Sequence, residues 1–360
     1  MNPAETRGVQ DLVRLCRVLG RDPLLVQAGG GNVSVKLPPD RLLVKASGLR
    51  LAEVSAARGW ARADAGLLRR GLAAIAGIRS ALPRDRAYAD LLGRAGRTPG
   101  WRVSMEAGFH ALIPDRCVAH VHSVAGLLLG ALPPAQARRR IRRILGAGVR
   151  IASVPAAVPG AELSLALARA LGRGARLGAG PRKPLLAVLR GHGLVWGAET
   201  AAELLRLSAA LETALRAEFG LDRYPPPHLC GSRGCRRAPA PRAEGWGELC
   251  FCRWPGCRLD FRPAFPDFVV YFSLWGRGAP DLVRTSERSA LLRADDAAGR
   301  RAKAEVLFAH ALAHTAAGAR GMPGLPPAMV RAIAGLESER LRLAQAARRG
   351  APSSAQGPSR

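Results

Sequence analysis

The sequence predicts an α/β fold, in which helices cover both faces of a central mixed sheet, followed by a smaller and mainly helical C-terminal unit. Two observations favour this class. Apolar β-rich runs alternate with amphipathic helical patterns as far as about residue 222, as is typical of layered α/β domains. The pattern then breaks at a stretch rich in Pro, Gly, Arg and Cys, and longer helical patterns follow. We therefore expect an α/β domain over 1–222, a connector over 223–265, a strand-and-helix extension over 266–348 and a disordered tail over 349–360.

The expected elements follow the chain in order. Hydrophobic spacing predicts a short helix over 9–20, and two β-rich runs around a Pro-Pro-Asp turn predict a hairpin with strands at 32–37 and 41–46. Ser104 can cap a helix that runs to about Leu112. The later patterns predict strands at 116–124, 149–155 and 184–190, helices at 161–172 and 199–219, a further strand at "DFVVYFSLWG" (267–276), and helices at about 300–317 and 326–347.

The chain carries 55 Lys and Arg residues against 27 Asp and Glu residues, a formal net charge of +28. Such a charge attracts polyanions, so nucleic acid is one candidate partner and a phosphorylated small molecule is another. Nearly all the basic residues are arginine, in a chain dominated by Ala, Gly, Leu and Pro, which G+C-rich codons also produce. The densest run, "ARRRIRRIL" (137–145), is equally consistent with a solvated helix face. Charge alone therefore does not predict nucleic-acid binding.

The remaining composition bears on the compartment. Hydrophobic residues make up 48% of the chain, enough for a sizeable core, yet no apolar run reaches the roughly 18–20 residues that span a bilayer. The first residues include acidic side chains and lack the basic-then-apolar order of a secretory signal. We expect a cytoplasmic protein without membrane contact.

The stretch "RCVAHVHSV" (116–124) places two histidines inside a run that reads as a buried strand. Side chains two apart on a strand point to the same face, so His120 and His122 project together. Burying an imidazole costs free energy unless its nitrogens find partners, and two imidazoles side by side match the needs of a divalent metal. The alternative is a pair of core histidines, each hydrogen-bonded to backbone or water.

Catalytic zinc commonly takes three protein ligands and leaves a further position open. His192 is the best candidate for the third ligand, because it follows an apolar strand and lies between two glycines that allow close approach. His310 and His314 form an H-x3-H pair that could also bind metal on a helix, but their surroundings favour packed or surface histidines.

The segment "SMEAGFH" (104–110) places Glu106 and His110 four residues apart, on one face of the predicted helix. The Glu106 carboxylate has three candidate roles: a general base, a fourth metal ligand, or a first-turn residue favoured by the helix dipole. Acid/base work requires a pKa raised toward neutrality, which we expect burial to provide and a metal to moderate.

Two glycine-rich segments suggest an anion site. "AGGGNVS" (28–34) leads into a strand, so it does not match the dinucleotide-binding fingerprint, but it suits a loop whose backbone N–H groups face an anion. "KASG" (45–48) offers the Lys45 ammonium, the Ser47 hydroxyl and the Gly48 amide, which together could hold a phosphate. Two ordinary turns are the alternative.

Five of the seven cysteines cluster between residues 230 and 257, with His228 nearby. A structural zinc site is one interpretation, but the C-x4-C-x14-C-x-C-x4-C spacing lacks the C-x2-C pairs typical of such sites. Because disulfides are not expected in a reducing cytoplasm, free thiols in an irregular segment are the alternative.

Taken in order, these motifs resemble the class II aldolase/adducin N-terminal family across about residues 8–220. That family shows G-N-x-S, a strand ending in S-G, a helix with E-x3-H, H-x-H on a strand, and H-G-L/V after another strand. The C-terminal extension resembles that of longer bacterial members. The matching positions are Gly31-Asn32-Val33-Ser34, Ser47-Gly48, Glu106 with His110, His120 with His122, and His192-Gly193-Leu194.

The resemblance implies a zinc-dependent aldolase-type lyase for a sugar phosphate or a similar hydroxy-carbonyl substrate, cleaved by a retro-aldol step through a metal-stabilised enediolate. His120, His122 and His192 would hold one zinc ion per subunit, Glu106 would be the acid/base carboxylate, and His110 would be structural. Family members usually form tetramers with sites near subunit contacts, so a homo-oligomer is also implied. The phosphate-site positions carried over are Gly31, Asn32, Ser47, Gly48 and Ser104.

The resemblance leaves two alternatives open: an enzyme similar to methylthioribulose-phosphate dehydratase or ribulose-phosphate 4-epimerase, and a non-catalytic adducin-like interaction module. A glutamate at 106 is more similar to the aldolases and the dehydratase than to the epimerase, for which aspartate is expected. Met105 stands where the small aldolases have a second serine, and the tyrosine of their C-terminal tail has no match here.

Overall fold

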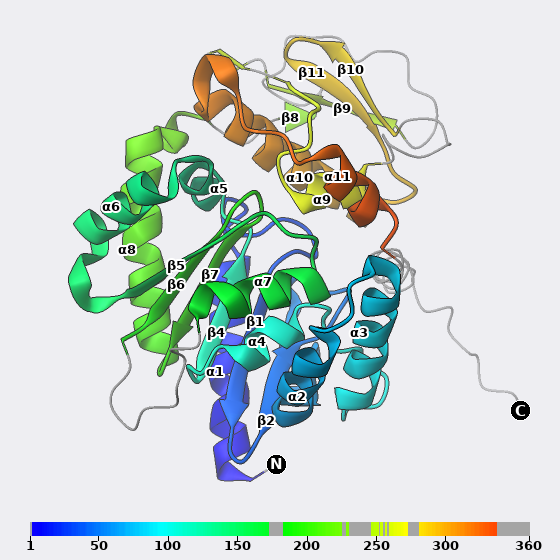
Figure 1. Cartoon of the computed structure of the whole chain (residues 1–360). Helices are drawn as coiled ribbons and strands as arrows, with labels where there is room; N and C mark the ends of the chain where they lie inside the picture. Colours follow the sequence, from blue (N-terminus) through cyan, green and yellow to red (C-terminus); the bar gives the residue numbers. More distant parts are fainter. Residues whose placement is uncertain are drawn as a thin grey trace, which may run out of the picture.

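The computed structural model describes residues 2–172, 183–224, 228–229, 246–251, 253–254, 256–257, 259–272 and 281–336. Within these ranges the chain forms a seven-stranded sheet between two helical layers and, beside it, a four-stranded sheet with three helices (Figure 1). The predicted α/β class with a central mixed sheet is therefore confirmed. The predicted segment boundaries remain predictions, and the predicted tail at 349–360 lies outside the described residues.

The large sheet has the strand order β3-β2-β1-β4-β7-β6-β5, in which β5 and β6 run parallel and the other neighbours antiparallel. The predicted hairpin is confirmed as β1 and β2, and the strands predicted at 149–155 and 184–190 are β5 and β6. The sequence patterns did not predict β3 and β7. The strands are β1 (Asn32–Leu37), β2 (Arg41–Lys45), β3 (Trp60–Asp64), β4 (Cys117–Val121), β5 (Arg150–Val154), β6 (Leu185–Leu189) and β7 (Gly193–Ala198).

Strand β4 lies in the middle of the large sheet, and every one of its residues is buried. Its neighbours β1 and β7 pair with it so that Asn32 and Val195 both lie opposite His120. Because both neighbours run antiparallel to β4, the last residues of β4 lie beside the first residues of β1 and β7. Residues from three distant parts of the sequence therefore meet at one end of the central strands.

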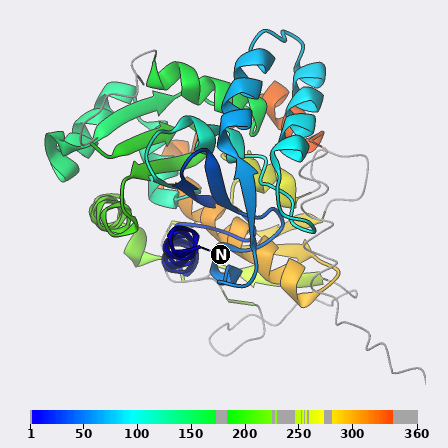
Figure 2. The same ribbon diagram turned by 90° about the horizontal axis from the view of Figure 1, so that it is seen from below.

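Helices cover both faces of this sheet (Figures 1 and 2). Helix α4 begins later than predicted, because Glu106 is its N-cap and Ser104 lies before it, accepting a hydrogen bond from the Glu106 N–H. One layer consists of α1 (Pro3–Gly20), α5 (Val124–Ala131), α6 (Pro134–Leu145) and α8 (Ala201–Phe219). The other consists of α2 (Ala65–Ile75), α3 (Ala81–Ala95), α4 (Ala107–Leu112) and α7 (Ala161–Leu171).

The C-terminal part contains a second, antiparallel sheet of order β10-β11-β9-β8. Its β8 and β9 fall within the segment predicted to be an irregular connector, so that prediction is wrong for 228–229 and 246–250. Strand β9 has only five residues, and the Pro, Gly and Arg residues around it give the segment the composition of a loop. The strands are β8 (His228–Leu229), β9 (Trp246–Cys250), β10 (Leu282–Ser286) and β11 (Ser289–Arg293).

Three helices accompany the small sheet. Helix α9 (Pro266–Tyr271) stands where a strand was predicted; a short apolar run does not distinguish strand from helix, and Pro266 at the first position favours a helix start. Helix α10 (Ala297–Ala316) confirms the helix predicted at about 300–317. Helix α11 (Pro327–Ala334) confirms the start of the helix predicted at 326–347, and residues 337–347 of that prediction lie outside the described residues. Among the described residues, no helix combines the length and the apolar character needed to cross a bilayer.

Candidate metal centre

Sheet topology brings the three predicted ligand histidines together. His120 is on β4, His122 follows the last residue of that strand, and His192 lies in the turn between β6 and β7. The pairing of β4 with β7 sets Val121 opposite Leu194, which places His192 beside the β4 histidines. All three side chains are buried, at most 3% exposed.

Glu106 joins the three histidines in one cluster, in which the ligand atoms all lie within 4.8 Å of one another. The Nε2 atoms of His120 and His122 are 3.0 Å apart, and Oε1 of Glu106 is 3.4 Å from Nε2 of His120 and 3.6 Å from Nε2 of His192. Ligand atoms of a tetrahedral zinc site, with bonds of about 2.0–2.1 Å, lie about 3.4 Å apart. The spacing of the cluster therefore fits a divalent ion.

The protonation of the imidazoles also fits a metal. Nδ1 of His120 donates to the Leu194 carbonyl at 2.9 Å, and Nδ1 of His122 is hydrogen-bonded to the Asp267 carboxylate. With both Nδ1 atoms protonated, the two Nε2 atoms face one another at 3.0 Å, close enough to share a proton or to bind one cation between them. Burial lowers the pKa of His192 well below its ordinary value, and His120 and His122 in their protonated forms lower that pKa further.

Glu106 is ionised in this cluster. Burial acts to raise the pKa of its carboxyl, but His120, His192 and His122 in their protonated forms outweigh burial and hold the pKa below its usual range. The expectation that burial lifts this pKa toward neutrality is therefore wrong in sign, because it ignored the histidines. A bound dication acts in the same direction. An ionised carboxylate suits a proton acceptor or a fourth metal ligand.

Gly193 allows the close approach of β4 and β7 at the cluster. Its φ of +148° is rarely adopted by L-residues, and a Cβ there would lie 2.2 Å from the Val121 carbonyl oxygen and 3.1 Å from the His122 Cα. Only glycine therefore lets the first residue of β7 lie against the last residues of β4. This accounts physically for the glycine that follows His192.

We expect Gly193→Ala to lower the free energy of unfolding by more than about 3 kcal/mol, because backbone strain and a backbone collision add. Gly146→Ala is the matched control: Gly146 also has a positive φ, +69°, but a Cβ there meets nothing within 4 Å. Strain alone should cost that variant about 1–3 kcal/mol. Urea unfolding measures both variants, and equal losses would contradict the collision.

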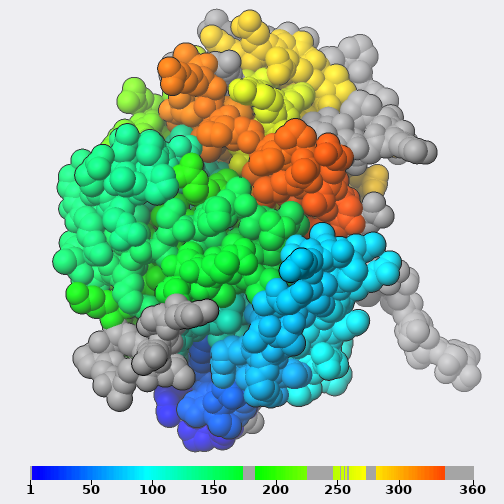
Figure 3. Space-filling model, viewed as in Figure 1, coloured from blue at the N-terminus to red at the C-terminus, as the bar shows by residue number. Residues whose placement is uncertain are grey.

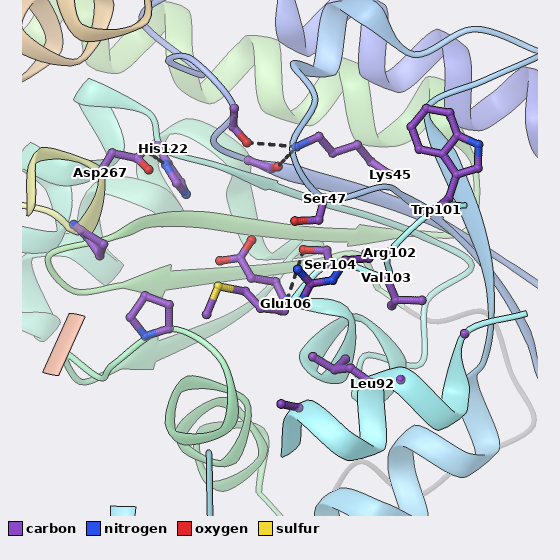
Figure 4. A pocket seen from close by; sticks show the side chains of 18 of the residues that line it. Lys45, Ser47, Leu92, Trp101, Arg102, Val103, Ser104, Glu106, His122 and Asp267 are labelled. Atoms are coloured by element: carbon purple, nitrogen blue, oxygen red, sulfur yellow. Dashed lines mark hydrogen bonds and ion pairs between the residues drawn. The ribbon is translucent and has the colours of Figure 1, made fainter. Parts of the chain in front are cut away.

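A cavity of about 260 Å³ lies beside the cluster (Figure 4). Asn32 is buried on β1 opposite His120, and Gly48 follows Ser47 in a turn. Most, but not all, of the predicted site residues line this cavity. Of these, Gly31, Ser47, Ser104, Glu106, His122 and His192 line it, whereas Asn32, Gly48 and His120 do not.

Several residues of the cavity were not found from the sequence. A bridge between Ala46 and Val103, with the Ser47 N–H donating to the Arg102 carbonyl at 3.0 Å, brings Trp101, Arg102 and Ser104 to the end of β2. The side chain of Arg102 has no hydrogen bond or ion pair with any other residue the structure describes. Its only sequence signal was a basic residue two positions before Ser104. Asp267, from α9, also lines the cavity.

Lys45 lines the cavity together with Ser47, and it also contacts the glycine-rich loop. Its ammonium donates to the carbonyl oxygens of Gly29 and Gly31, at 2.9 and 3.4 Å (Figure 4). The buried charge thereby holds the glycine-rich loop in place at the wall of the cavity.

His310 and His314 are packed histidines, in agreement with the interpretation favoured by the sequence. Both are buried on α10, and their Nε2 atoms lie 2.9 and 3.1 Å from the carbonyl oxygen of Arg262. The His310 ring stacks on Phe268 of α9, with ring centroids 3.6 Å apart. Neither belongs to a cluster of metal-ligating groups among the described residues.

The cysteine cluster is only partly described. Cys250 is buried, Cys257 is partly buried, and both are free thiols. The hypothesis of a second metal site remains a prediction, since Cys230, Cys235 and Cys252 lie outside the described residues.

The fold and the site together define a layered α/β domain with a candidate metal centre at one end of the central strands of its large sheet. The chain belongs to the Class II Aldolase and Adducin N-terminal domain family, whose sequence profile matches residues 10–219. It therefore has an aldolase-like scaffold. A search of curated proteins finds no match.

Similar solved structures include the N-terminal class II aldolase domain of a conserved protein from Thermoplasma acidophilum, with 28% identity and a TM-score of 0.46, covering 58% of this chain and 92% of that one. The L-fuculose 1-phosphate aldolase from Glaciozyma antarctica has 15% identity, a TM-score of 0.39, and coverage of 60% and 74%. The L-fuculose-1-phosphate aldolase from Thermus thermophilus has 19% identity, a TM-score of 0.37, and coverage of 59% and 94%.

Proposed function

We propose that this protein is a zinc-dependent aldolase-type lyase that cleaves a C–C bond in a phosphorylated hydroxy-carbonyl compound. The observation that carries the proposal is the buried cluster of Glu106 with His120, His122 and His192, which lies at the wall of a cavity of about 260 Å³. Membership of the class II aldolase and adducin family supports it. The convergence of buried imidazoles beside a cavity favours an enzyme over a non-catalytic module.

The proposed mechanism gives each residue one task. When bound, the metal supplies a Lewis acid for adjacent carbonyl and hydroxyl oxygens of the substrate. His120, His122 and His192 would hold the ion as neutral imidazoles. Glu106 would accept the proton of the hydroxyl whose oxygen becomes the new carbonyl, and would deliver it to the carbon released from the broken C–C bond. Its ionised state suits the first of these two transfers.

The phosphate is proposed to bind at the part of the cavity that Ser47, Ser104 and Arg102 line. The hydroxyls of Ser47 and Ser104 and the guanidinium of Arg102 offer donors there, and a guanidinium forms strong, charge-assisted hydrogen bonds to phosphate. The backbone of Gly31 lines the same cavity. Arg102 would compensate for the missing serine at Met105. The formal net charge of +28 would draw anionic substrates toward the protein.

We further propose that each subunit binds one zinc ion, that the protein forms a homo-oligomer, and that it is located in the cytoplasm. The small-molecule partner is preferred over nucleic acid because the cavity can enclose only a small ligand. Nucleic-acid binding that depends only on the protein's charge would weaken steeply as the salt concentration rises.

Metal removal tests the proposed function directly. We expect the zinc-loaded protein to release an aldehyde from at least one member of a panel of ketose 1-phosphates. Dialysis against a chelator should reduce turnover to background, and zinc should restore it, because the imidazoles remain in place. Turnover that survives complete metal removal would contradict the proposal. Dehydration or epimerisation of the panel, or metal-independent binding of a protein partner without turnover, would replace it with the corresponding alternative.

A further inference from the structure

We propose that Asp267, on α9 of the C-terminal part, is a positioning residue of the metal centre, whose carboxylate holds the His122 imidazole with its Nε2 toward the ion. The inference rests on the metal site of the proposed function and adds a residue from outside the stretch 10–219 that the family profile matches. Figure 4 shows the two side chains directed toward one another at the edge of the cavity, and Figure 3 shows the C-terminal part lying against the large domain.

The first argument is the hydrogen bond itself. Oδ2 of Asp267 accepts from Nδ1 of His122, and the two residues are only 2% and 3% exposed. A neutral imidazole has one ring proton, and an ionised carboxylate can only accept, so this contact draws the proton to Nδ1 and leaves a lone pair on Nε2. The Leu194 carbonyl does the same for His120. Two of the three imidazoles are thus oriented by hydrogen-bond acceptors on the side of the ring away from the cluster.

The second argument is how closely the loop fits around the pair. A Cβ on Gly30 would lie 2.7 Å from Nδ1 of His122 and 2.8 Å from Oδ2 of Asp267, so the glycine leaves just enough space for the hydrogen bond. The same loop is held by other C-terminal residues: the Gly29 N–H donates to the Tyr271 hydroxyl at 3.1 Å, and the Ala28 N–H donates to Glu305 at 2.9 Å.

The third argument is the support beneath Asp267. Helix α9 packs between α10 and α11, and its Phe268 stacks on His310. His310 and His314 both contact the Arg262 carbonyl, in the chain that leads into α9. The histidine pair of α10 therefore fixes the helix that presents the carboxylate. A buried carboxylate on such a rigid element is placed to orient its partner.

Zinc affinity of the full chain tests the inference. We expect Asp267→Ala to bind Zn²⁺ about 10–100-fold more weakly, and the nearly isosteric Asp267→Asn about tenfold more weakly, because an amide oxygen is a weaker acceptor than a carboxylate. With Co²⁺ in place of zinc, both variants should show a changed visible absorption spectrum as the His122 imidazole reorients. Competition with a chromophoric chelator measures affinity without any substrate.

Glu305→Gln is the matched control, since Glu305 is also a carboxylate of the C-terminal part and contacts the same loop through Ala28, but not a histidine of the cluster. It should keep the parent affinity and cobalt spectrum. Parent-like zinc binding by the Asp267 variants, or an equal loss in Glu305→Gln, overturns the inference; if Asp267→Ala fails to fold, Asp267→Asn decides. A parent that binds zinc but cleaves no sugar phosphate contradicts the proposed function alone, whereas a parent that binds no zinc contradicts both.

Discussion

His192→Ala is expected to weaken zinc binding strongly, so that the purified variant loses most of its metal on dialysis where the parent keeps one ion per chain. The cluster has four donor groups among the described residues, and this substitution removes the only one supplied by the turn before β7. Two histidines and a carboxylate remain, a set that can still bind zinc, but it offers one imidazole fewer and would use as a ligand the Glu106 carboxylate that is proposed to move the proton. Without the Lewis acid, turnover should fall by about 10³-fold or more. Elemental analysis after dialysis, followed by the aldehyde assay, measures both effects.

The matched control is His110→Asn. His110 is also buried, burial lowers its pKa well below the ordinary value, and it lies near the cluster without belonging to it. Its Nδ1 instead contacts the Ser34 hydroxyl at 2.8 Å, and its ring stacks on Phe109. The variant should keep its zinc and lose only about 1–3 kcal/mol of stability. Zinc retained by His192→Ala, or lost equally by both variants, would contradict the assignment of the ligands.

Glu106→Gln is expected to lower kcat by about 10²–10⁴-fold while zinc stays bound, because the amide preserves the volume of the side chain but cannot take up a proton. The three imidazoles that would hold the ion are untouched. The carboxylate is ionised in the cluster, so its replacement removes a base that is already in the active form. Steady-state kinetics at saturating zinc, with the metal content of the same sample, give the measurement.

A glutamate remote from the cavity serves as the control for this substitution. Glu203 lies in the first turn of α8 and does not line the cavity, so Glu203→Gln should turn over substrate like the parent. If Glu106→Gln kept its kcat within a few-fold of the parent, Glu106 would not carry the proton. Loss of zinc from that variant would instead assign the carboxylate mainly to metal binding.

Local patterns allowed much of the scaffold to be predicted. The hairpin of β1 and β2, the helices α1, α7, α8 and α10, and the strands β5 and β6 lie close to the predicted ranges, since turn residues and periodicity act over a few neighbouring residues. The first part of "DFVVYFSLWG" was wrongly predicted as a strand. An apolar run of this length suits either structure, and its packing between α10 and α11 decides for a helix.

The sequence by itself determined that His120 and His122 share a side of one strand, because the direction of strand side chains depends only on the chain's own alternation. Only the tertiary structure decided what they meet. His192 joins them because β7 pairs antiparallel with β4, and Asp267 does so because α9 packs at the same edge. The sign of the Glu106 pKa shift depended likewise on the distances to three imidazoles. No spacing along the chain encodes such contacts, because strand order and helix packing bring them together through space.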